Sequence, residues 1–215
     1  MGRYDLAVFD LDGTILDTTE GVLSAVKYTI QEMGYKMPDD SVLKTFIGPP
    51  IQDSFAKTFG LSGNILQKIA TIFRNRYKDF DLLKAKPYDG IYEVLRNLSV
   101  RNVIPAVATY KREDYAITLL KSYHFDQYTQ IMHGADHENK LKKQDIIKEC
   151  IYEAGILDYN RVVMIGDTIH DADGASKLGI DFVGVTYGFG LKEDELSQIV
   201  SIGFADTPIR LLDFI

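Results

Sequence analysis

Residues 7–18 read AVFDLDGTILDT, an apolar run that ends in two aspartates, Asp10 and Asp12, followed at once by Gly13 and Thr14. A short run of apolar, β-branched and aromatic residues is typical of a buried strand. Two carboxylates separated by one leucine repel each other at the end of such a strand. The stretch therefore predicts a strand end at which a positively charged partner meets the acids.

Other segments of the chain repeat the strand pattern and alternate with helical patterns. Short apolar runs lie at residues 6–9, 103–108, 130–132, 162–165 and 182–185. Helical periodicity lies at residues 91–98, 115–120, 146–154 and 172–178. Strands that alternate with helices predict an α/β protein with a parallel sheet covered by helices on both faces.

The interval between the first two strands is far longer than one crossover needs. Residues 18–80 show helical periodicity and no convincing strand. Thr18 or Thr19 can cap a first helix that Gly34 ends. We therefore expect an α-helical domain at residues 16–85, inserted into a catalytic core made of residues 1–15 and 86–215.

Composition narrows the class of partner. Apolar residues make up 46% of the 215 residues, the formal net charge is -7 and the pI is near 5.1. A phosphate backbone or an anionic membrane is bound mostly by clustered Lys and Arg, so we expect a small-molecule partner, with neither nucleic acid nor membrane.

Location and assembly follow less directly from the sequence. No apolar stretch approaches 18 residues, the first ten residues carry charges, and Cys150 lies among apolar residues at helical spacing. These features predict a cytoplasmic protein with a buried structural thiol. A monomer and a homodimer both remain open.

Reactive side chains follow the other predicted strands. Thr109 closes the second strand, Asp167 follows the strand at residues 162–165, and Asp171 lies one helical turn further on. Lys142 and Lys143 open the helix that leads to that strand. Because ligands of open parallel sheets bind beyond the carboxyl ends of the strands, these residues are expected to meet Asp10 and Asp12 in one crevice.

The residue types in this crevice predict phosphoryl transfer. Several carboxylates need a hard divalent cation, and Mg²⁺ suits a site that also holds a phosphate. Asp10 can attack phosphorus, while Asp12 can serve first as general acid and then as general base. Thr109 and Lys143 can bind the non-bridging oxygens, and Asp167 with Asp171 can complete the metal shell.

Other interpretations of the first acids are weaker. Two acids at a strand end also occur in ordinary solvated turns. A calcium loop of the EF-hand type needs glycine at its sixth position and glutamate at its twelfth, where Ile15 and Gly21 stand. The joint occurrence of all these residues at strand ends favours the phosphoryl-transfer site.

Taken together, these motifs resemble the haloacid dehalogenase-like hydrolase superfamily, in particular its phosphoglycolate phosphatase-like branch. DLDGT at 10–14 matches the first motif, Thr109 the second, Lys143 the third, and GDTIHD at 166–171 the fourth. The resemblance implies a Rossmann-like core, a helical cap, Mg²⁺ dependence and metal ligation by Asp10, Asp167, Asp171 and the main-chain carbonyl of Asp12. It also implies phosphate or substrate contacts at Leu11, Gly13, Thr109, Tyr110, Lys143 and, in the cap segment FIGPPIQDSF, Gly48 and Pro49.

Two departures from the family pattern stand out. Tyr110 occupies a position where such phosphatases often have Ser or Asn, and no proline follows Lys143. Lys142 competes with Lys143 for the third motif, although the pattern KQDII favours Lys143.

The function expected from these residues is a Mg²⁺-dependent phosphatase that hydrolyses a small organic phosphate monoester, such as a phosphoglycolate-like compound, a nucleotide or a sugar phosphate. Asp12 argues against a dehalogenase, because dehalogenases of the superfamily typically lack the second aspartate. A phosphotransferase or phosphomutase with the same aspartyl-phosphate intermediate is the alternative. A signalling module phosphorylated on aspartate fits the DxD spacing and the long helical insert less well.

Overall fold

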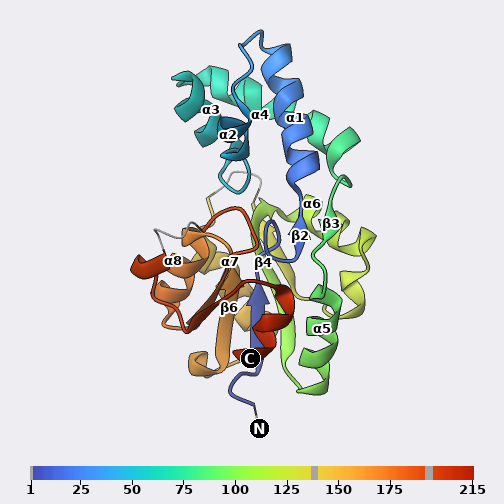
Figure 1. Ribbon diagram of the computed structural model, residues 1–215, viewed down its shortest axis with the longest axis vertical. Helices are drawn as coiled ribbons and strands as arrows, with labels where there is room; N and C mark the ends of the chain where they lie inside the picture. The colour runs from blue at the N-terminus through green and yellow to red at the C-terminus, as the bar shows by residue number, and fades with distance from the viewer. Residues whose placement is uncertain (1, 137–139, 192–195) are drawn as a thin grey trace. The chain divides into compact units, whose positions relative to one another are not determined.

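The computed structural model describes residues 2–136, 140–191 and 196–215. The chain forms two compact units, which are described separately (Figure 1). One comprises Met1–Asp17 and Pro87–Ile215, here called the core unit; the other is Thr18–Lys86, the helical unit. Two short strands, β2 (Leu16–Asp17) and β3 (Lys86–Pro87), pair where the chain passes from one unit to the other.

The core unit is built on a six-stranded sheet with the order β5-β4-β1-β6-β7-β8. Its strands are β1 (Leu6–Phe9), β4 (Ile104–Arg112), β5 (Met132–Ala135), β6 (Val162–Gly166), β7 (Asp181–Val185) and β8 (Gly203–Ala205). Every neighbouring pair runs parallel. Because β1 lies between β4 and β6, the carboxyl ends of these three strands form one continuous edge.

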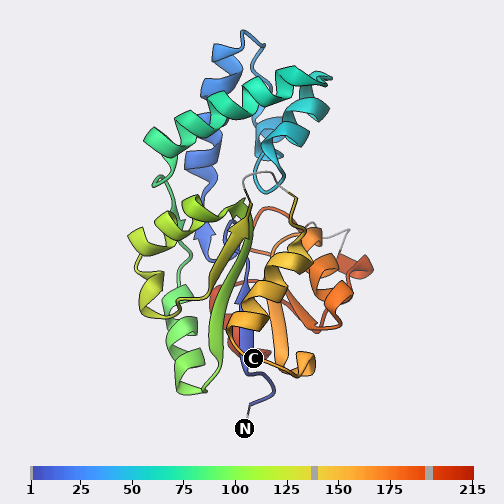
Figure 2. The ribbon, with the colours of Figure 1, turned by 180° about the vertical axis from the view of Figure 1, so that it is seen from behind.

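Helices cover both faces of this sheet, as parallel strands require (Figures 1 and 2). They are α5 (Ile91–Val100), α6 (Glu113–Ser122), α7 (Lys143–Glu153) and α8 (Ile169–Leu178), with short 3₁₀ turns η2 (Phe125–Gln127), η3 (Tyr159–Arg161), η4 (Leu196–Gln198) and η5 (Pro208–Asp213). Helices α7 and α8 pack against each other, while α5 and α6 contact β4. The predicted α/β, Rossmann-like core is confirmed.

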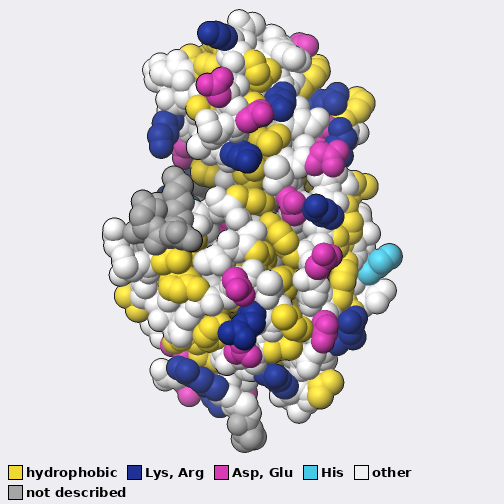
Figure 3. Space-filling model, in the orientation of Figure 1, with side chains coloured by type: hydrophobic (Ala, Val, Ile, Leu, Met, Phe, Trp, Pro, Cys, Tyr) yellow, Lys and Arg dark blue, Asp and Glu magenta, His cyan; other side chains and the backbone are white. Residues whose placement is uncertain are grey.

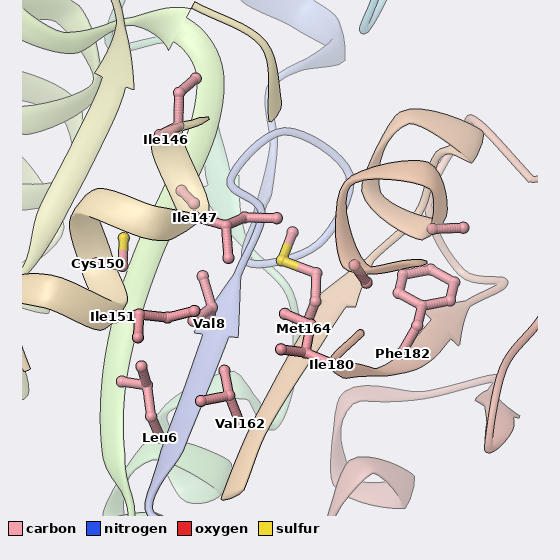
Figure 4. Packing of buried hydrophobic residues seen from close by; sticks show 14 residues of the cluster. Leu6, Val8, Ile146, Ile147, Cys150, Ile151, Val162, Met164, Ile180 and Phe182 are labelled. Carbon is pink, nitrogen blue, oxygen red and sulfur yellow. The ribbon is translucent and has the colours of Figure 1, made fainter. Parts of the chain in front are cut away.

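Alternation along the strands explains how one face is filled. Leu6 and Val8 of β1 point toward α7, where they meet Ile147 and Ile151 (Figure 4). The Cys150 thiol is buried in the same cluster, and its Sγ donates to the Val107 carbonyl oxygen at 3.3 Å. Burial raises the pKa of this thiol, which agrees with the predicted structural role.

The helical unit has a small core of its own. It consists of α1 (Thr19–Glu32), α2 (Asp40–Lys44), α3 (Ile51–Phe59), α4 (Asn64–Arg76) and the π-helical turn η1 (Tyr77–Asp81). The aromatic rings of Phe46, Phe55 and Phe59 pack in sequence, with Tyr35 stacked on Phe59. Gly34 follows α1 with a φ of +70°, a left-handed conformation that suits the predicted helix stop.

The structure corrects several predicted strands. The third strand lies at Met132–Ala135 rather than at 130–132. Thr109 does not close its strand, because β4 continues to Arg112 through an irregularity in its pairing with β5 after Ala108. The strand β8 was not predicted, since Gly203–Ala205 is too short for an alternating pattern.

On the face drawn in Figure 3, basic and acidic side chains are interspersed, rather than gathered into one basic stripe. Within residues 2–136, 140–191 and 196–215, no helix combines the length and the apolar composition that crossing a bilayer requires.

Candidate active site

The sheet places the first motif at the carboxyl edge of its central strand. Asp10 follows β1 directly, and its backbone N–H donates to the Ile165 carbonyl oxygen of β6 at 2.8 Å. Asp167 follows β6 in the same way. Register between the two strands therefore brings the two aspartates to neighbouring positions at one strand edge.

A buried lysine joins two acids of different motifs. Lys143 is the first residue of α7, and its Nζ lies 2.5 Å from Asp10 Oδ1 and 2.7 Å from Asp171 Oδ1. The residue is 2% exposed, and Asp171 is fully buried. Asp171 Oδ2 accepts hydrogen bonds from the Thr168 N–H and hydroxyl, which fixes it in the first turn of α8.

Asp167 is held from the opposite side by a loop after β7. Its Oδ2 accepts hydrogen bonds from the N–H groups of Phe189 at 2.9 Å and Gly190 at 3.1 Å. Its Oδ1 is buried and has no hydrogen-bond partner among the residues that the structure describes. A buried carboxylate oxygen without a partner is costly, so this atom is available as a ligand for a cation.

Burial and mutual repulsion dominate the electrostatics. Burial raises the pKa of Asp10 to about 7, with further increases from Asp171 and Asp12, although Lys143 opposes them. Burial, Asp10 and Asp171 likewise raise the pKa of Asp167 well above its usual value. Burial disfavours the charge of Lys143, but the two carboxylates beside it raise its pKa overall.

The donor set fits a hard divalent cation. Asp10, Asp167 and Asp171 each offer a carboxylate oxygen, and these three oxygens lie within 4.8 Å of one another. Carboxylate oxygens are the ligands that Mg²⁺ prefers, and the partnerless Asp167 Oδ1 is one of the atoms available. These three carboxylates could hold a divalent cation, and the identity of the ion stays a prediction.

Asp12 and Thr109 lie beside this group with partners of their own. The Lys111 Nζ is 3.0 Å from Asp12 Oδ1, and the side chains of both residues are mostly buried. Thr109 is 1% exposed, and its Oγ1 accepts a hydrogen bond from the Lys111 N–H at 3.1 Å. The carboxylate of Asp12 is outside the three-acid group, and the predicted ligation by its carbonyl stays a prediction.

The remaining predicted residues fall into two groups. Leu11 is fully buried, and its carbonyl oxygen accepts three backbone hydrogen bonds that close the turn. Gly13 has a φ of +82°, and its N–H donates to the Leu16 carbonyl oxygen. Gly48 and Pro49 are exposed in the connection between α2 and α3 of the helical unit. Their predicted substrate contacts remain proposals.

The two competing lysines differ in position. Lys143 belongs to the buried group, while Lys142 is exposed at the N-cap of α7, where its N–H donates to Asp145 Oδ2 at 3.0 Å.

The family comparison agrees with this arrangement. A family model described as haloacid dehalogenase-like hydrolase matches residues 7–185. The chain belongs to this hydrolase family. The predicted resemblance and the predicted class of phosphatase-like hydrolase are therefore confirmed.

Three relatives illustrate the range within the family. The hydrolase is 34% identical over 195 residues to a 5'-nucleotidase of Pseudomonas aeruginosa. The matched region covers 90% of this chain and 87% of that protein. It is 30% identical to a phosphoglycolate phosphatase of Agrobacterium fabrum, over 86% of this chain and 81% of that protein. A solved structure of Mycobacterium tuberculosis protein tyrosine kinase A is 28% identical with a TM-score of 0.85, over the whole of both chains. This hydrolase spans 63% of the full-length kinase.

Sequence reasoning missed two parts of the site. One is Lys111, which pairs with Asp12; a lysine two residues beyond the motif threonine was the available signal. The other is the loop 187–190, YGFG, at the end of β7. Its two glycines let the backbone approach Asp167 so closely that a Cβ on Gly188 or Gly190 would lie 2.5 Å or 2.4 Å from atoms of that residue.

Proposed function

We propose that this hydrolase is a Mg²⁺-dependent phosphatase that removes phosphate from a small organic monoester through an aspartyl-phosphate intermediate on Asp10. The observation that carries the proposal is the buried contact of Asp10 with Lys143, next to the carboxylates of Asp167 and Asp171. An anionic nucleophile, an ammonium group and a set of oxygen ligands are the parts that phosphoryl transfer needs.

The charges of the site suit a dianionic phosphate only when a cation is present. Bound by Asp10, Asp167 and Asp171, Mg²⁺ supplies the positive charge that offsets these carboxylates and attracts the phosphate. Lys143 then adds a fixed positive charge for the non-bridging oxygens, and the Thr109 hydroxyl adds a hydrogen-bond donor.

In the first proposed step, an Asp10 carboxylate oxygen forms a bond to phosphorus while the bond from phosphorus to the ester oxygen breaks. Asp12 donates a proton to the ester oxygen, and the alcohol leaves. In the second step, water forms a bond to phosphorus while the bond to Asp10 breaks. Asp12 takes the proton from that water, so phosphate leaves and both aspartates return to their starting states.

We further propose that the helical unit serves as the cap that selects the substrate, with Gly48 and Pro49 in its substrate-facing segment. The unit carries ten Lys and Arg against seven Asp and Glu, although the whole chain has a net charge of -7. An excess of positive charge on a cap favours anionic substrates. The named relatives support nucleotides and phosphoglycolate as the first compounds to test.

The test is phosphate release by this 215-residue chain with Mg²⁺ from p-nitrophenyl phosphate and from a panel of nucleotides, sugar phosphates and small phosphate esters. We expect multiple turnovers with at least one ester. The Asp10→Asn variant should lose at least about a thousandfold in kcat, because the amide is a poor nucleophile, and should unfold at an unchanged or higher temperature.

Two outcomes would contradict the proposal. One is an absence of phosphate release from every member of the panel; the other is full activity of the Asp10→Asn variant. A long-lived phosphoprotein without turnover would instead support the signalling module.

Phosphoryl transfer to an acceptor hydroxyl is the second candidate, and the tyrosine kinase among the relatives is the observation that favours it. Both reactions share the Asp10 intermediate and differ in whether water or a hydroxyl group attacks it. Supplying a phosphate-ester donor together with a sugar phosphate or a tyrosine-containing peptide as acceptor, and comparing free phosphate with phosphorylated acceptor, separates the two.

A further inference from the structure

The side chain of Lys143 is confined along its whole length. Its Cβ and Cγ pass so close to Gly174 of α8 that a Cβ added to that glycine would lie 3.2 and 3.0 Å from them. Its Nζ ends between Asp10 and Asp171. The direction of this side chain therefore depends on how the first turn of α7 is held.

One side chain holds that turn through the backbone. Lys143 is the first residue of α7, and the N–H groups of a first helical turn have no partner within the helix. The Lys143 N–H donates to the hydroxyl oxygen of Tyr110 at 3.0 Å. The same tyrosine ring lies beside the charged end of the side chain, with Nζ 5.5 Å from the ring centroid.

Tyr110 is itself fixed by its surroundings. It belongs to β4, and its partly buried ring packs against the core cluster beneath α7. The ring of His170 meets it edge to face at a centroid distance of 5.6 Å. Tyr110 thus connects the strand of the second motif with the helix of the third and with the first turn of α8 in the fourth.

We propose that Tyr110 is a positioning residue that holds Lys143 in place beside Asp10, rather than a residue that binds the phosphate. The inference rests on the proposed function, in which Lys143 neutralises the phosphoryl group. A Ser or Asn at this position has a shorter side chain than Tyr. The tyrosine hydroxyl therefore extends further from β4 toward the Lys143 N–H than the usual residues of the motif would.

The test compares Tyr110→Phe with the wild-type protein. This variant keeps the ring and removes only the hydroxyl. Because one hydrogen bond of ordinary net strength corresponds to about a fivefold change, we expect kcat to fall about fivefold while KM changes less than twofold. In a Lys143→Gln background, the same change at Tyr110 should alter kcat less than twofold, because the group it positions is gone.

Tyr92→Phe is the matched control. The Tyr92 hydroxyl also forms a hydrogen bond with a backbone group of the core unit, here as the donor to the Tyr123 carbonyl oxygen at 2.6 Å. Tyr92 belongs to α5, on the sheet face that does not carry Lys143. Its loss should leave kcat unchanged. An equal loss in both variants would show a general effect of removing a tyrosine hydroxyl and would overturn the proposal.

Two further results would also overturn it. The first is a raised KM with unchanged kcat in Tyr110→Phe, which indicates a direct substrate contact. The second concerns hydrogen exchange of the Lys143 backbone amide, measured by NMR. We expect this exchange to be at least about fivefold faster in Tyr110→Phe than in the wild-type protein, and an unchanged rate would overturn the proposal. This exchange needs no activity, so an inactive wild-type protein would refute the proposed function and leave the role of Tyr110 to be decided separately.

Discussion

Three buried carboxylates lie together at the carboxyl edge of the sheet, and two of them contact one lysine ammonium. Lys143 contacts Asp10 and Asp171, whereas Asp167 Oδ1 has no hydrogen-bond partner among the described residues. The negative charge at this place therefore exceeds what Lys143 alone balances. Stability and function should both respond to a cation here.

The first prediction concerns Asp167→Asn. A ligand that binds only the folded state stabilises it, by about 2.7 kcal/mol at a hundred times its Kd, so Mg²⁺ should raise the unfolding temperature of the wild-type protein and EDTA should reverse the rise. Asp167→Asn should lose most of this increase, because it replaces a carboxylate ligand. Thermal scans with and without Mg²⁺ measure it, and Asp173→Asn, at an exposed position of α8, is the control. An equal Mg²⁺ shift in the two variants would contradict the assignment.

The second prediction concerns Gly13→Ala. Gly13 has a φ of +82°, and a Cβ there would lie 2.2 Å from Asp167 Oδ2. The substitution combines backbone strain, about 1–2 kcal/mol, with displacement of a site residue, so we expect kcat to fall at least about tenfold. Gly179→Ala separates the two effects, because Gly179 has a φ of +67° with nothing within 4 Å of its added Cβ. Steady-state kinetics of both variants measure the effect. An equal loss of kcat in Gly13→Ala and Gly179→Ala would show that backbone strain alone is responsible.

At the scale of elements, the π-helical turn η1 is tied to its neighbours by one buried acid. The fully buried Asp81 accepts hydrogen bonds from Arg76 Nε at 2.8 Å and Ser24 Oγ at 2.9 Å, and Lys84 Nζ lies 2.7 Å away. A Cβ on Gly21 would lie 2.4 Å from the Asp81 carbonyl oxygen, so α1 approaches this turn at a glycine. The acid thus joins α1, α4 and η1 within the helical unit.

The third prediction is the pH dependence of this cluster. Burial opposes the charge of Asp81, but the hydrogen bonds from Lys84, Arg76 and Ser24 lower its pKa overall. A lowered pKa in the folded state gives stability that is present above the unfolded pKa, about 3.9, and is lost as the pH falls through the folded pKa. Asp81→Asn should lower the free energy of unfolding by about 2 kcal/mol near pH 7. This is less than the loss on breaking a fully buried ion pair, because Arg76 and Lys84 are partly exposed. Urea unfolding at several pH values measures the difference, which should shrink below about pH 4; a constant difference would contradict it.

Elements long enough to show a sequence pattern could be predicted, and very short ones could not. Helix α1 was predicted to begin after Thr18 or Thr19 and to end at Gly34, and it runs from Thr19 to Glu32, because a capping residue and a glycine stop are local signals. The two-residue strands β2 and β3 and the three-residue β8 lack room for a pattern. The irregularity after Ala108 depends on pairing with β5, which is a tertiary property, so the sequence indicated that Thr109 ends its strand.

The site residues that could be predicted are those that lie next to a predicted strand or helix end at the carboxyl edge of the sheet. Asp10 and Asp167 lie together because parallel strands end at the same edge, and Lys143 joins them because α7 begins at that edge; this rule needs no coordinates. The partners of these residues were not predictable in the same way. Lys111 meets Asp12 only through the path of β4 beyond Thr109, and the loop 187–190 reaches Asp167 only through the neighbouring position of β7.

At the scale of the whole molecule, charge is divided unevenly along the chain. The helical unit carries ten basic against seven acidic residues within a chain of net charge -7. If this unit is the cap, it attracts anionic substrates through charges that salt screens, since the screening length falls from about 10 Å at 0.1 M to about 3 Å at 1 M.

The fourth prediction is therefore an ionic-strength effect on substrate binding. Raising NaCl from 50 to 500 mM at constant Mg²⁺ should raise KM for a nucleotide about threefold and leave kcat within about twofold, because the buried reacting groups are screened much less. Steady-state kinetics measure it, with p-nitrophenyl phosphate as the less charged comparison. A fall in KM with salt would contradict the electrostatic role.

The central claim is that Asp10 becomes covalently phosphorylated, and trapping that intermediate tests it most directly. In Asp12→Asn, p-nitrophenyl phosphate should still phosphorylate Asp10, because its leaving group needs no proton, while the attack of water is slowed for lack of a general base. Acid quenching within the first turnover, followed by peptide mass spectrometry, should then find one phosphoryl group on Asp10. Release of p-nitrophenol without any phosphoryl group on Asp10, or with the group on another residue, would contradict the account.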